Sequence, residues 1–293
     1  MNPSTAIATV ERTQLANTSG AASDGQLVEL WLQGRSEHTR RAYAADVGRF
    51  LAYVAKPLHT ASVADVSGFA VSLTGSGSTR CRALSAVKSL LTFGQRTGYL
   101  TFNVGAAIKL PRSKGTLAQR ILAEPDVQRM LALEPGARNR VLLRLLYAAG
   151  LRVSELCGLT VADLQARDDG GQITVFGKGS KTRAVLLPAT VWAELAAIIA
   201  GRQPAEPVFT SRKHGGQLDA SAVHRIVRSA AKRAGIAGNV SPHWLRHAHA
   251  SHALDRGAPA HLVQATLGHS SLAVTSVYAH ARPSDSSARY LAV

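Results

Sequence analysis

Acidic residues and cysteines are both scarce in this chain of 293 residues. Only 18 Asp and Glu accompany 34 Lys and Arg, which gives a formal net charge of +16 at pH 7. The two cysteines, Cys81 and Cys157, are far apart in the sequence and offer no pair with metal-binding spacing. We therefore expect both to be reduced, buried residues of a cytoplasmic protein.

Targeting and membrane-spanning segments are also missing from the sequence. No apolar run reaches roughly 18 residues, the length that a transmembrane helix needs. The first residues, MNPSTAIATVERTQ, lack the basic start and apolar middle of a signal peptide. Their arginine stands beside a glutamate, which argues against a mitochondrial presequence. The chain is 46% hydrophobic, enough to form a core and unlike a disordered protein.

The surplus of basic residues points to an anionic partner. Nucleic acid is the first candidate, because neutralised phosphates release counterions and so drive binding. A membrane-binding protein would carry a basic amphipathic helix or a compact polybasic block, whereas here the basic residues are scattered over the whole chain. A basic surface without a partner is the remaining alternative, and a charge of +16 argues against it.

The first part of the chain is expected to be a tail followed by a small helical domain. Residues 1–23 are mostly small and polar, so we predict a flexible N-terminal tail. Further on, apolar residues recur every three or four positions, as in SEHTRRAYAADVGRFLAYV (Ser36–Val54) and in TRCRALSAVKSLLTFGQRTGY from Thr79. Residues 24–108 are therefore predicted to form an all-helical domain.

A basic linker and a second domain follow. Residues 109–120, KLPRSKGTLAQR, contain four basic residues and no acid, together with proline and glycine. They are typical of an interdomain linker that could lie against a phosphate backbone, and equally of a solvated loop. Residues 121–293 are predicted to be a second, mostly helical domain with a C-terminal tail. Its hairpin is QITVFGKGSKTRAVLLP, where apolar residues alternate on both sides of the turn GKGS.

Two short stretches of the second domain offer cationic side chains. In AAGLRVSELCGL, Gly150 can end one helix, and Arg152 and Glu155 share a face if a helix resumes at once. The two charges form either an exposed ion pair of small energy or an arginine that a carboxylate orients into a cleft. At the hairpin turn, Lys178 and Lys181 either keep the turn soluble or reach a phosphate and donate a proton.

The stretch SPHWLRHAHASHAL combines a helix start with an arginine and several histidines. Ser241 is a candidate N-cap, with Pro242 at the first helical position. His243 and Arg246 share a face in the first turns, where a helix N-terminus favours an anion. His243 and His247 also have a spacing that can hold zinc. No cysteine or nearby carboxylate completes such a set, so a metal site is the minor alternative.

The last stretch, LGHSSLAVTSVYAH, places a tyrosine among small and aliphatic residues. Gly268 can end a helix, His269 follows it, and Tyr278 lies beyond another short helical run. A lone tyrosine in such a position is most often a core residue with its hydroxyl hydrogen-bonded. Its interpretation changes because an arginine, a lysine, a His-Arg pair and a histidine precede it in one basic domain.

Four motifs in this order make the chain resemble the tyrosine recombinase (phage integrase) family, and especially the bacterial Xer-type recombinases. They are GLRVSELCGL, GKGSKTRAVLLP, SPHWLRHAHASHAL and LGHSSLAVTSVYAH. Each is weak alone, and their shared order is specific. The resemblance covers about residues 24–282. It implies a mainly α fold with a small antiparallel β-sheet, in which an all-helical core-binding (SAM-like) domain precedes the catalytic domain.

The resemblance implies DNA strand cleavage by transesterification, with no metal, ATP or other cofactor. The Tyr278 hydroxyl would attack a phosphodiester, leaving a 3′-phosphotyrosyl link and a free 5′-hydroxyl. A 5′-hydroxyl of a second strand would then reverse the step. Arg152 and Arg246 would clamp the phosphate oxygens and offset the charge of the transition state. Lys178, with Lys181 as the alternative, would protonate the leaving oxygen.

The remaining motif residues match supporting positions of the family. His243 matches the position that assists as acid, base and phosphate ligand, and His269 matches one that hydrogen-bonds the phosphate. Glu155 matches the acidic position that orients the site. Outside these motifs, Tyr290 in the C-terminal tail is the only alternative to Tyr278 that we consider as the nucleophile.

The implied partner is double-stranded DNA with a specific recombination site. The family further implies self-association into a tetramer on two DNA sites, a possible second recombinase or accessory protein, no membrane, and a place in the cytoplasm at the nucleoid. In the N-terminal domain, four residues near the start of a helix could touch DNA, although a solvated helix face has the same composition. These are Arg80, Arg82, Ser85 and Lys88.

Four other functions compete with this interpretation. A type IB topoisomerase and a telomere resolvase share the chemistry, but the Xer-like motifs and the short chain argue against both. A DNA-binding regulator on a recombinase scaffold would be expected to lack a catalytic residue, and none is missing here. A metal-dependent nuclease would be stopped by EDTA, which should not affect the recombinase.

Overall fold

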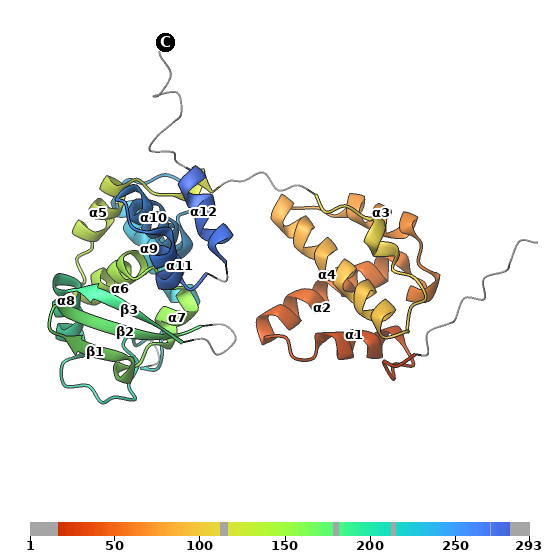
Figure 1. The fold of residues 1–293 in the computed structure, drawn as a ribbon, viewed down its shortest axis with the longest axis horizontal. Helices are drawn as coiled ribbons and strands as arrows, with labels where there is room; N and C mark the ends of the chain where they lie inside the picture. The colour runs from red at the N-terminus through yellow and green to blue at the C-terminus, as the bar shows by residue number, and fades with distance from the viewer. Residues whose placement is uncertain (1–16, 112–116, 178–181, 212–214, 270, 282–293) are drawn as a thin grey trace, which may run out of the picture. The chain divides into compact units, whose positions relative to one another are not determined.

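The structure is a computed structural model that describes residues 17–111, 117–177, 182–211, 215–269 and 271–281. The chain divides into two compact units, Met1–Lys114 and Gly115–Val293. The first is helical, and the second combines helices with a three-stranded antiparallel sheet (Figure 1). The predicted fold class, mainly α with a small antiparallel sheet, is confirmed. None of the described helices is long and apolar enough to cross a membrane.

The described part of the first unit contains four α-helices, and each begins at a serine. They are α1 (Asp24–Leu32), α2 (Glu37–Val54), α3 (Val63–Ser72) and α4 (Gly77–Arg96). The hydroxyls of Ser23, Ser36, Ser62 and Ser76 each accept a hydrogen bond from a backbone N–H of the first turn. Such caps satisfy donors that a helix start leaves unpaired. Local sequence therefore determines where these helices begin.

Residues 17–23, the described part of the predicted N-terminal tail, are attached to the first unit. The backbone N–H of Thr18 donates to the carbonyl of Thr97 at 2.8 Å, and Ala21 is buried. Two short 3₁₀ helices, η1 (Leu58–Thr60) and η2 (Val104–Ala107), complete the unit. The other residues of the predicted tail, 1–16, lie outside the described part of the chain.

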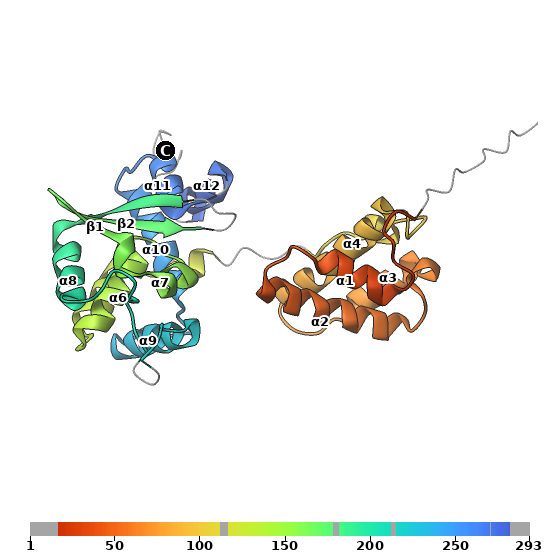
Figure 2. The same ribbon diagram turned by 90° about the horizontal axis from the view of Figure 1, so that it is seen from below.

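The second unit contains eight described α-helices and one sheet. The helices are α5 (Glu124–Ala132), α6 (Ala137–Ala148), α7 (Val153–Gly158), α8 (Ala189–Ile199), α9 (Ala220–Arg233), α10 (Pro242–Asp255), α11 (Ala260–Leu267) and α12 (Leu272–Ala281). The short 3₁₀ helices are η3 (Ala118–Arg120) and η4 (Val161–Asp163). Helix α10 packs against α5, α6, α9, α11 and α12, and Figure 2 shows it among them. Because it touches so many elements, α10 can bring their side chains to one site.

The sheet has the order β1-β2-β3, formed by β1 (Leu164–Arg167), β2 (Gly170–Phe176) and β3 (Thr182–Pro188). Ile173 pairs with Val185 across β2 and β3, and both are buried, as are Val175 and Leu187. The alternation predicted for the hairpin is therefore confirmed, and α8 covers β2 and β3. The turn itself, residues 178–181, lies outside the described residues.

The two cysteines differ in their surroundings. Both are free thiols, and Cys157 on α7 is buried. Burial raises its pKa to about 11, with the nearby Asp219 adding to the effect. The expectation that Cys81 is also buried is wrong, because this residue of α4 is only partly covered.

Candidate active site

A sharp turn between α6 and α7 positions the first pair of predicted site residues. Gly150 adopts the left-handed conformation with φ of 57° directly after α6, and Arg152 is the N-cap of α7. The carboxylate of Glu155 accepts hydrogen bonds from the Arg152 backbone N–H and from its Nη1, both at 2.7 Å. The helix thus resumes at once, and the predicted pairing of Arg152 with Glu155 is present.

A second arginine, which the sequence did not predict, also forms hydrogen bonds with the carboxylate of Glu155. Arg183 on β3 donates Nη1 and Nη2 to the two carboxylate oxygens at 2.8 and 2.9 Å, and its Nε donates to the Thr266 carbonyl at 2.7 Å. Burial of Glu155 favours the neutral acid, but the hydrogen bonds from Arg183 and Arg152 outweigh it and lower its pKa to about 2. A permanently charged carboxylate therefore ties β3 to α7 and α11.

Arg246 on α10 joins the α6–α7 turn to the end of α11. Its guanidinium donates to the carbonyls of Gly150 and Leu267, the latter at 2.5 Å. The side chain is almost fully buried, and burial followed by the charge of Arg152 lowers its pKa to about 10. Arg246 is still a cation at neutral pH. Two of the five N–H groups of the guanidinium donate to these carbonyls, and the other N–H groups can donate to a ligand.

The start of α10 places His243 at the surface of the protein. Ser241 occupies the N-cap position without a capping hydrogen bond from its side chain, and Pro242 opens the helix. His243 is exposed at the second position of the helix. Partial desolvation, and then the charges of Arg246, His224 and Arg152, lower the pKa of its imidazole. A neutral ring with an exposed face can approach a bound phosphate.

His269 follows the glycine that ends α11. Gly268 has φ of 61°, as a left-handed C-cap requires, and its carbonyl accepts from Nη2 of Arg152 at 3.0 Å. The imidazole of His269 bonds Thr275 through Nδ1 at 2.9 Å and stacks on the Tyr278 ring, with centroids 6.1 Å apart. Burial, followed by the charges of nearby arginines, lowers its pKa to about 4.

Tyr278 on α12 is buried, with an exposed fraction of 6%. Its hydroxyl lies 2.8 Å from Nδ1 of His247 on α10, and burial raises its pKa above the usual value. The residue is thus packed like a core tyrosine and also lies beside His269. Five of the predicted site residues lie close together, at the ends of α7, α10, α11 and α12. Contacts made by Arg152, Arg246 and His269 connect them. They are Arg152, Glu155, Arg246, His269 and Tyr278.

Comparison with known proteins identifies the family of the chain. The description of the phage integrase family matches residues 120–285, and that of the phage integrase N-terminal SAM-like domain matches residues 27–98. The chain belongs to the phage integrase family. It is 33% identical to tyrosine recombinase XerC of Mycobacterium leprae over 267 residues, covering 84% of this chain and 89% of that one. Tyrosine recombinase XerD of Pseudomonas aeruginosa is 34% identical over 289 residues, covering 91% and 96%.

Solved structures of integrase-type recombinases share the fold. XerH recombinase in a post-cleavage complex with its palindromic difH substrate has a TM-score of 0.70 and 22% identity, covering 89% of this chain and 82% of that one. A lambda integrase dimer bound to a COC′ core site has a TM-score of 0.70 and 18% identity, covering 92% and 81%. At these identities the likeness concerns the fold alone.

The other two histidines of α10, His249 and His252, form hydrogen bonds within the protein. Nδ1 of His249 bonds the Tyr147 carbonyl at 2.8 Å, and His252 bonds the Tyr147 hydroxyl and the Leu122 carbonyl at 3.0 and 3.1 Å. Within the described residues, no group of three or more His, Cys, Asp or Glu side chains is placed to hold a metal ion. The minor alternative of a zinc site therefore has no geometric support in that part of the chain.

The remaining predicted site residues are two lysines of the hairpin turn and four residues of the N-terminal unit. Lys178 and Lys181 lie outside the described residues. In the N-terminal unit, Arg82 binds the buried carboxylate of Asp46 and Lys88 binds the Ile108 carbonyl. The other two predicted DNA contacts, Arg80 and Ser85, are exposed and partly buried, respectively. Their contact with DNA stays a prediction.

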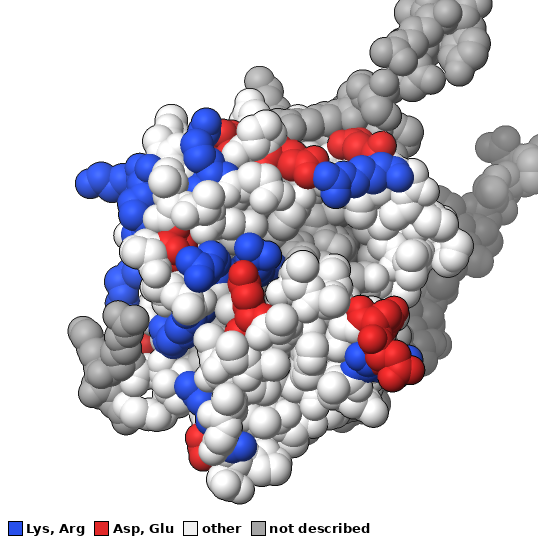
Figure 3. Space-filling view, turned by 90° about the vertical axis from the view of Figure 1, so that its left-hand side faces the viewer, with Lys and Arg blue, Asp and Glu red and all other residues white. Residues whose placement is uncertain are grey.

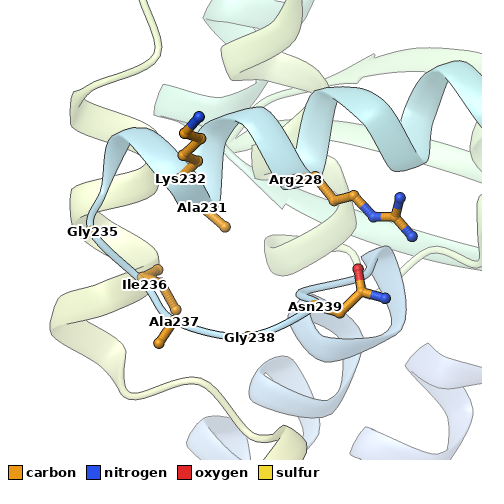
Figure 4. Close-up of a pocket in the computed structure, with 8 residues that line it drawn as sticks. All are labelled: Arg228, Ala231, Lys232, Gly235, Ile236, Ala237, Gly238 and Asn239. Atoms are coloured by element: carbon orange, nitrogen blue, oxygen red, sulfur yellow. The ribbon is translucent and has the colours of Figure 1, made fainter.

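Two further surface features lie apart from the predicted site residues. A pocket at the end of α9 is lined by Arg228, Lys232 and Asn239 with the loop that leads to α10, and by none of the predicted catalytic residues (Figure 4). The face of the second unit drawn in Figure 3 carries acidic groups beside basic ones. The excess of positive charge is therefore not gathered on that face.

Proposed function

We propose that this integrase-family protein is a site-specific recombinase that cuts and rejoins DNA through Tyr278. The observation that carries this proposal is the position of the Tyr278 ring beside His269, at the cluster held by Arg152 and Arg246. The tyrosine oxygen forms a bond to phosphorus as the bond from phosphorus to the 5′-oxygen breaks. A 5′-oxygen of a second strand then displaces the tyrosine, so the energy of the phosphodiester is kept.

The neighbouring groups suit this reaction. Arg152 and Arg246 bind the non-bridging oxygens and offset the negative charge of the pentavalent transition state, a task that metal ions perform in other phosphoryl-transfer enzymes. His269 and His243 hydrogen-bond the phosphate, and Glu155 orients Arg152. Lys178, or Lys181 in a shifted register, protonates the leaving 5′-oxygen. No metal or ATP takes part.

Double-stranded DNA is the proposed partner. The XerH and lambda integrase structures of the same fold contain their DNA sites, and a net charge of +16 favours phosphate binding. The N-terminal unit and the basic linker add contacts to the duplex, including those of Arg80, Arg82, Ser85 and Lys88. Recombination between two sites calls for a tetramer, formed by this chain alone or with a second recombinase.

The proposed nucleophile is tested by trapping the covalent intermediate. Nicked DNA fragments tiled across the region beside the gene are mixed with the protein in EDTA and analysed on a denaturing gel. We expect a protein–DNA adduct with wild type and with Tyr290→Phe, and none with Tyr278→Phe. An adduct that persists in Tyr278→Phe would show that another residue is the nucleophile. Tight specific binding without any adduct would support a DNA-binding regulator or an obligate partner.

A further inference from the structure

The Tyr278 hydroxyl contacts a histidine to which the family motifs give no role. Nδ1 of His247 lies 2.8 Å from the tyrosine oxygen, and the two rings are 5.6 Å apart at their centroids with an interplanar angle of 41°. In the part of the chain that the structure describes, this is the hydrogen bond recorded for that hydroxyl. His247 therefore touches the atom that would attack the phosphate.

The two histidines of the motifs are placed differently. His269 lies parallel to the Tyr278 ring, with an interplanar angle of 7°, and its Nδ1 is bonded to Thr275. The ring of His243, one turn earlier on α10, is tilted by 33° relative to that of His247, with the centroids 6.4 Å apart. Glu155, the nearest carboxylate of the cluster, is occupied by two arginines. Among these groups, only His247 is in hydrogen-bond range of the tyrosine oxygen.

The protonation states before DNA binds suit a proton transfer in this direction. Burial, followed by the charges of His243, Arg120 and Arg246, lowers the pKa of His247 to about 4, so its ring is neutral at neutral pH. Burial raises the pKa of Tyr278, so its hydroxyl keeps its proton. A neutral imidazole with its proton on Nε2 can accept at Nδ1.

We propose that His247 is the proton acceptor for Tyr278 during strand cleavage. This rests on the proposed recombinase function. As the tyrosine oxygen bonds to phosphorus, its proton passes to Nδ1 of His247, and the 5′-oxygen leaves with a proton from Lys178. In the rejoining step, the incoming 5′-hydroxyl gives up its proton on the lysine side, and the imidazolium returns its proton to the departing tyrosine oxygen. Atoms and charges balance over the two steps.

Binding of the DNA phosphate makes this transfer easier. The phosphate carries a negative charge next to Arg246, one of the cations that disfavour protonation of His247. An opposite charge within a few ångströms raises the pKa of a nearby imidazole. The tyrosine proton also becomes more acidic as its oxygen bonds to phosphorus. The site therefore keeps the nucleophile protonated until a phosphate arrives.

The first test compares His247→Asn with His261→Asn in single-turnover cleavage of a nicked substrate. Asparagine reaches the position of Nδ1 with an amide that forms a hydrogen bond but takes no proton. We expect His247→Asn to cleave about 100-fold more slowly or worse, the usual contribution of a general base. His261 is an exposed histidine of α11, so His261→Asn should cleave at the wild-type rate. Binding to a single DNA site and circular dichroism confirm that each variant is folded.

The second test uses a DNA substrate in which sulfur replaces the bridging 5′-oxygen. It distinguishes a defect at the attacking tyrosine from a defect at the leaving group. A thiolate leaves without a proton, so this substrate should restore cleavage by Lys178→Ala. It should not restore cleavage by His247→Asn, whose defect lies at the nucleophile. Rescue of His247→Asn by sulfur would place the histidine at the leaving group and overturn the proposal. A rate for His247→Asn within about threefold of wild type on the oxygen substrate, far below a general-base contribution, would also overturn it.

A third measurement needs no DNA and so distinguishes failure of this inference from failure of the proposed function. Nitrogen-15 NMR of histidine-labelled protein reports which ring nitrogen carries the proton. We expect His247 to have an unprotonated Nδ1 whose resonance shifts in Tyr278→Phe. A proton on Nδ1 would overturn the inference even if wild type forms the adduct. Absence of an adduct with wild type, both alone and with a second recombinase, would instead refute the recombinase function itself.

Discussion

Glu155 illustrates how single residues hold this site in place. One carboxylate accepts hydrogen bonds from Arg152 and Arg183, and the two cations keep it ionised far below its usual pKa. Arg183 also binds the Thr266 carbonyl of α11. Strand β3 is thereby fixed to α7 and α11 beside Arg152.

The sequence predicted site residues whose partners are close to them in the chain. It did not reveal residues whose partners are close only in the folded structure. Arg152 and Glu155 are three residues apart, so helical periodicity predicted their contact. Arg183 is 28 residues from Glu155 and His247 is 31 from Tyr278. Only tertiary packing brings those pairs together. The signal for His247 in the sequence was its spacing from His243, which can hold zinc but more often belongs to a packing or surface histidine.

Partly buried histidines make the stability of the protein sensitive to acid. His247 and His269 have folded-state pKa values of about 4 against an ordinary value of 6.5. Between these values the unfolded chain binds protons that the folded chain does not. The free energy of unfolding therefore falls as pH is lowered from about 6.5 to about 4, by up to about 1.4 kcal/mol per pH unit for each such histidine.

Chemical denaturation of wild type and His247→Asn at several pH values in this range measures the effect. We expect a shallower dependence on pH in the variant, because one of the histidines whose pKa is lowered in the folded protein is gone. Equal slopes for wild type and His247→Asn would mean that His247 is already charged in the folded protein.

At the scale of elements, the α6–α7 turn connects two parts of the site. Gly150 gives its carbonyl to Arg246 and has φ of 57°, which L side chains rarely adopt. A Cβ at this position would lie 2.5 Å from Cδ2 of Leu267, at the end of α11. The turn therefore depends on glycine for its conformation and for the close approach of α11.

We predict that Gly150→Ala destabilises the protein by about 2–4 kcal/mol, from backbone strain and overpacking together, and slows cleavage by moving Arg246. Gly257→Ala is the matched control, because its φ is 82° but a Cβ there would meet nothing within 4 Å. It should cost about 1 kcal/mol from conformation alone. Thermal unfolding of the two variants tests this, and equal losses would contradict a role for the contact with Leu267.

The local sequence predicted these elements well where their ends carry a chemical signal. Gly268 ends α11 as predicted, and the alternating apolar residues of β2 and β3 are buried. Ser241 begins α10 without the expected side-chain hydrogen bond. The attachment of Thr18 to Thr97 was not predicted, because it joins segments 79 residues apart through backbone groups.

At the scale of the whole molecule, the chain consists of two compact units, Met1–Lys114 and Gly115–Val293. We propose that the C-terminal segment adds contacts between protomers, as the Xer resemblance implies. Residues 282–293 lie outside the described structure. Deleting residues 284–293 should weaken cooperative synapsis of two DNA sites while leaving binding to one site largely intact. Gel-shift titration and a recombination assay measure both, and full recombination after the deletion would contradict this role.

The central claim, that Tyr278 becomes covalently joined to DNA, is tested most directly by identifying the joined residue. The trapped adduct of wild type would be digested with nuclease and protease, and the peptide that retains a nucleotide would be sequenced by mass spectrometry. The account predicts a nucleotide linked through a 3′-phosphate to Tyr278, in the peptide that contains LAVTSVYAH. A nucleotide on any other residue, Tyr290 included, would contradict it.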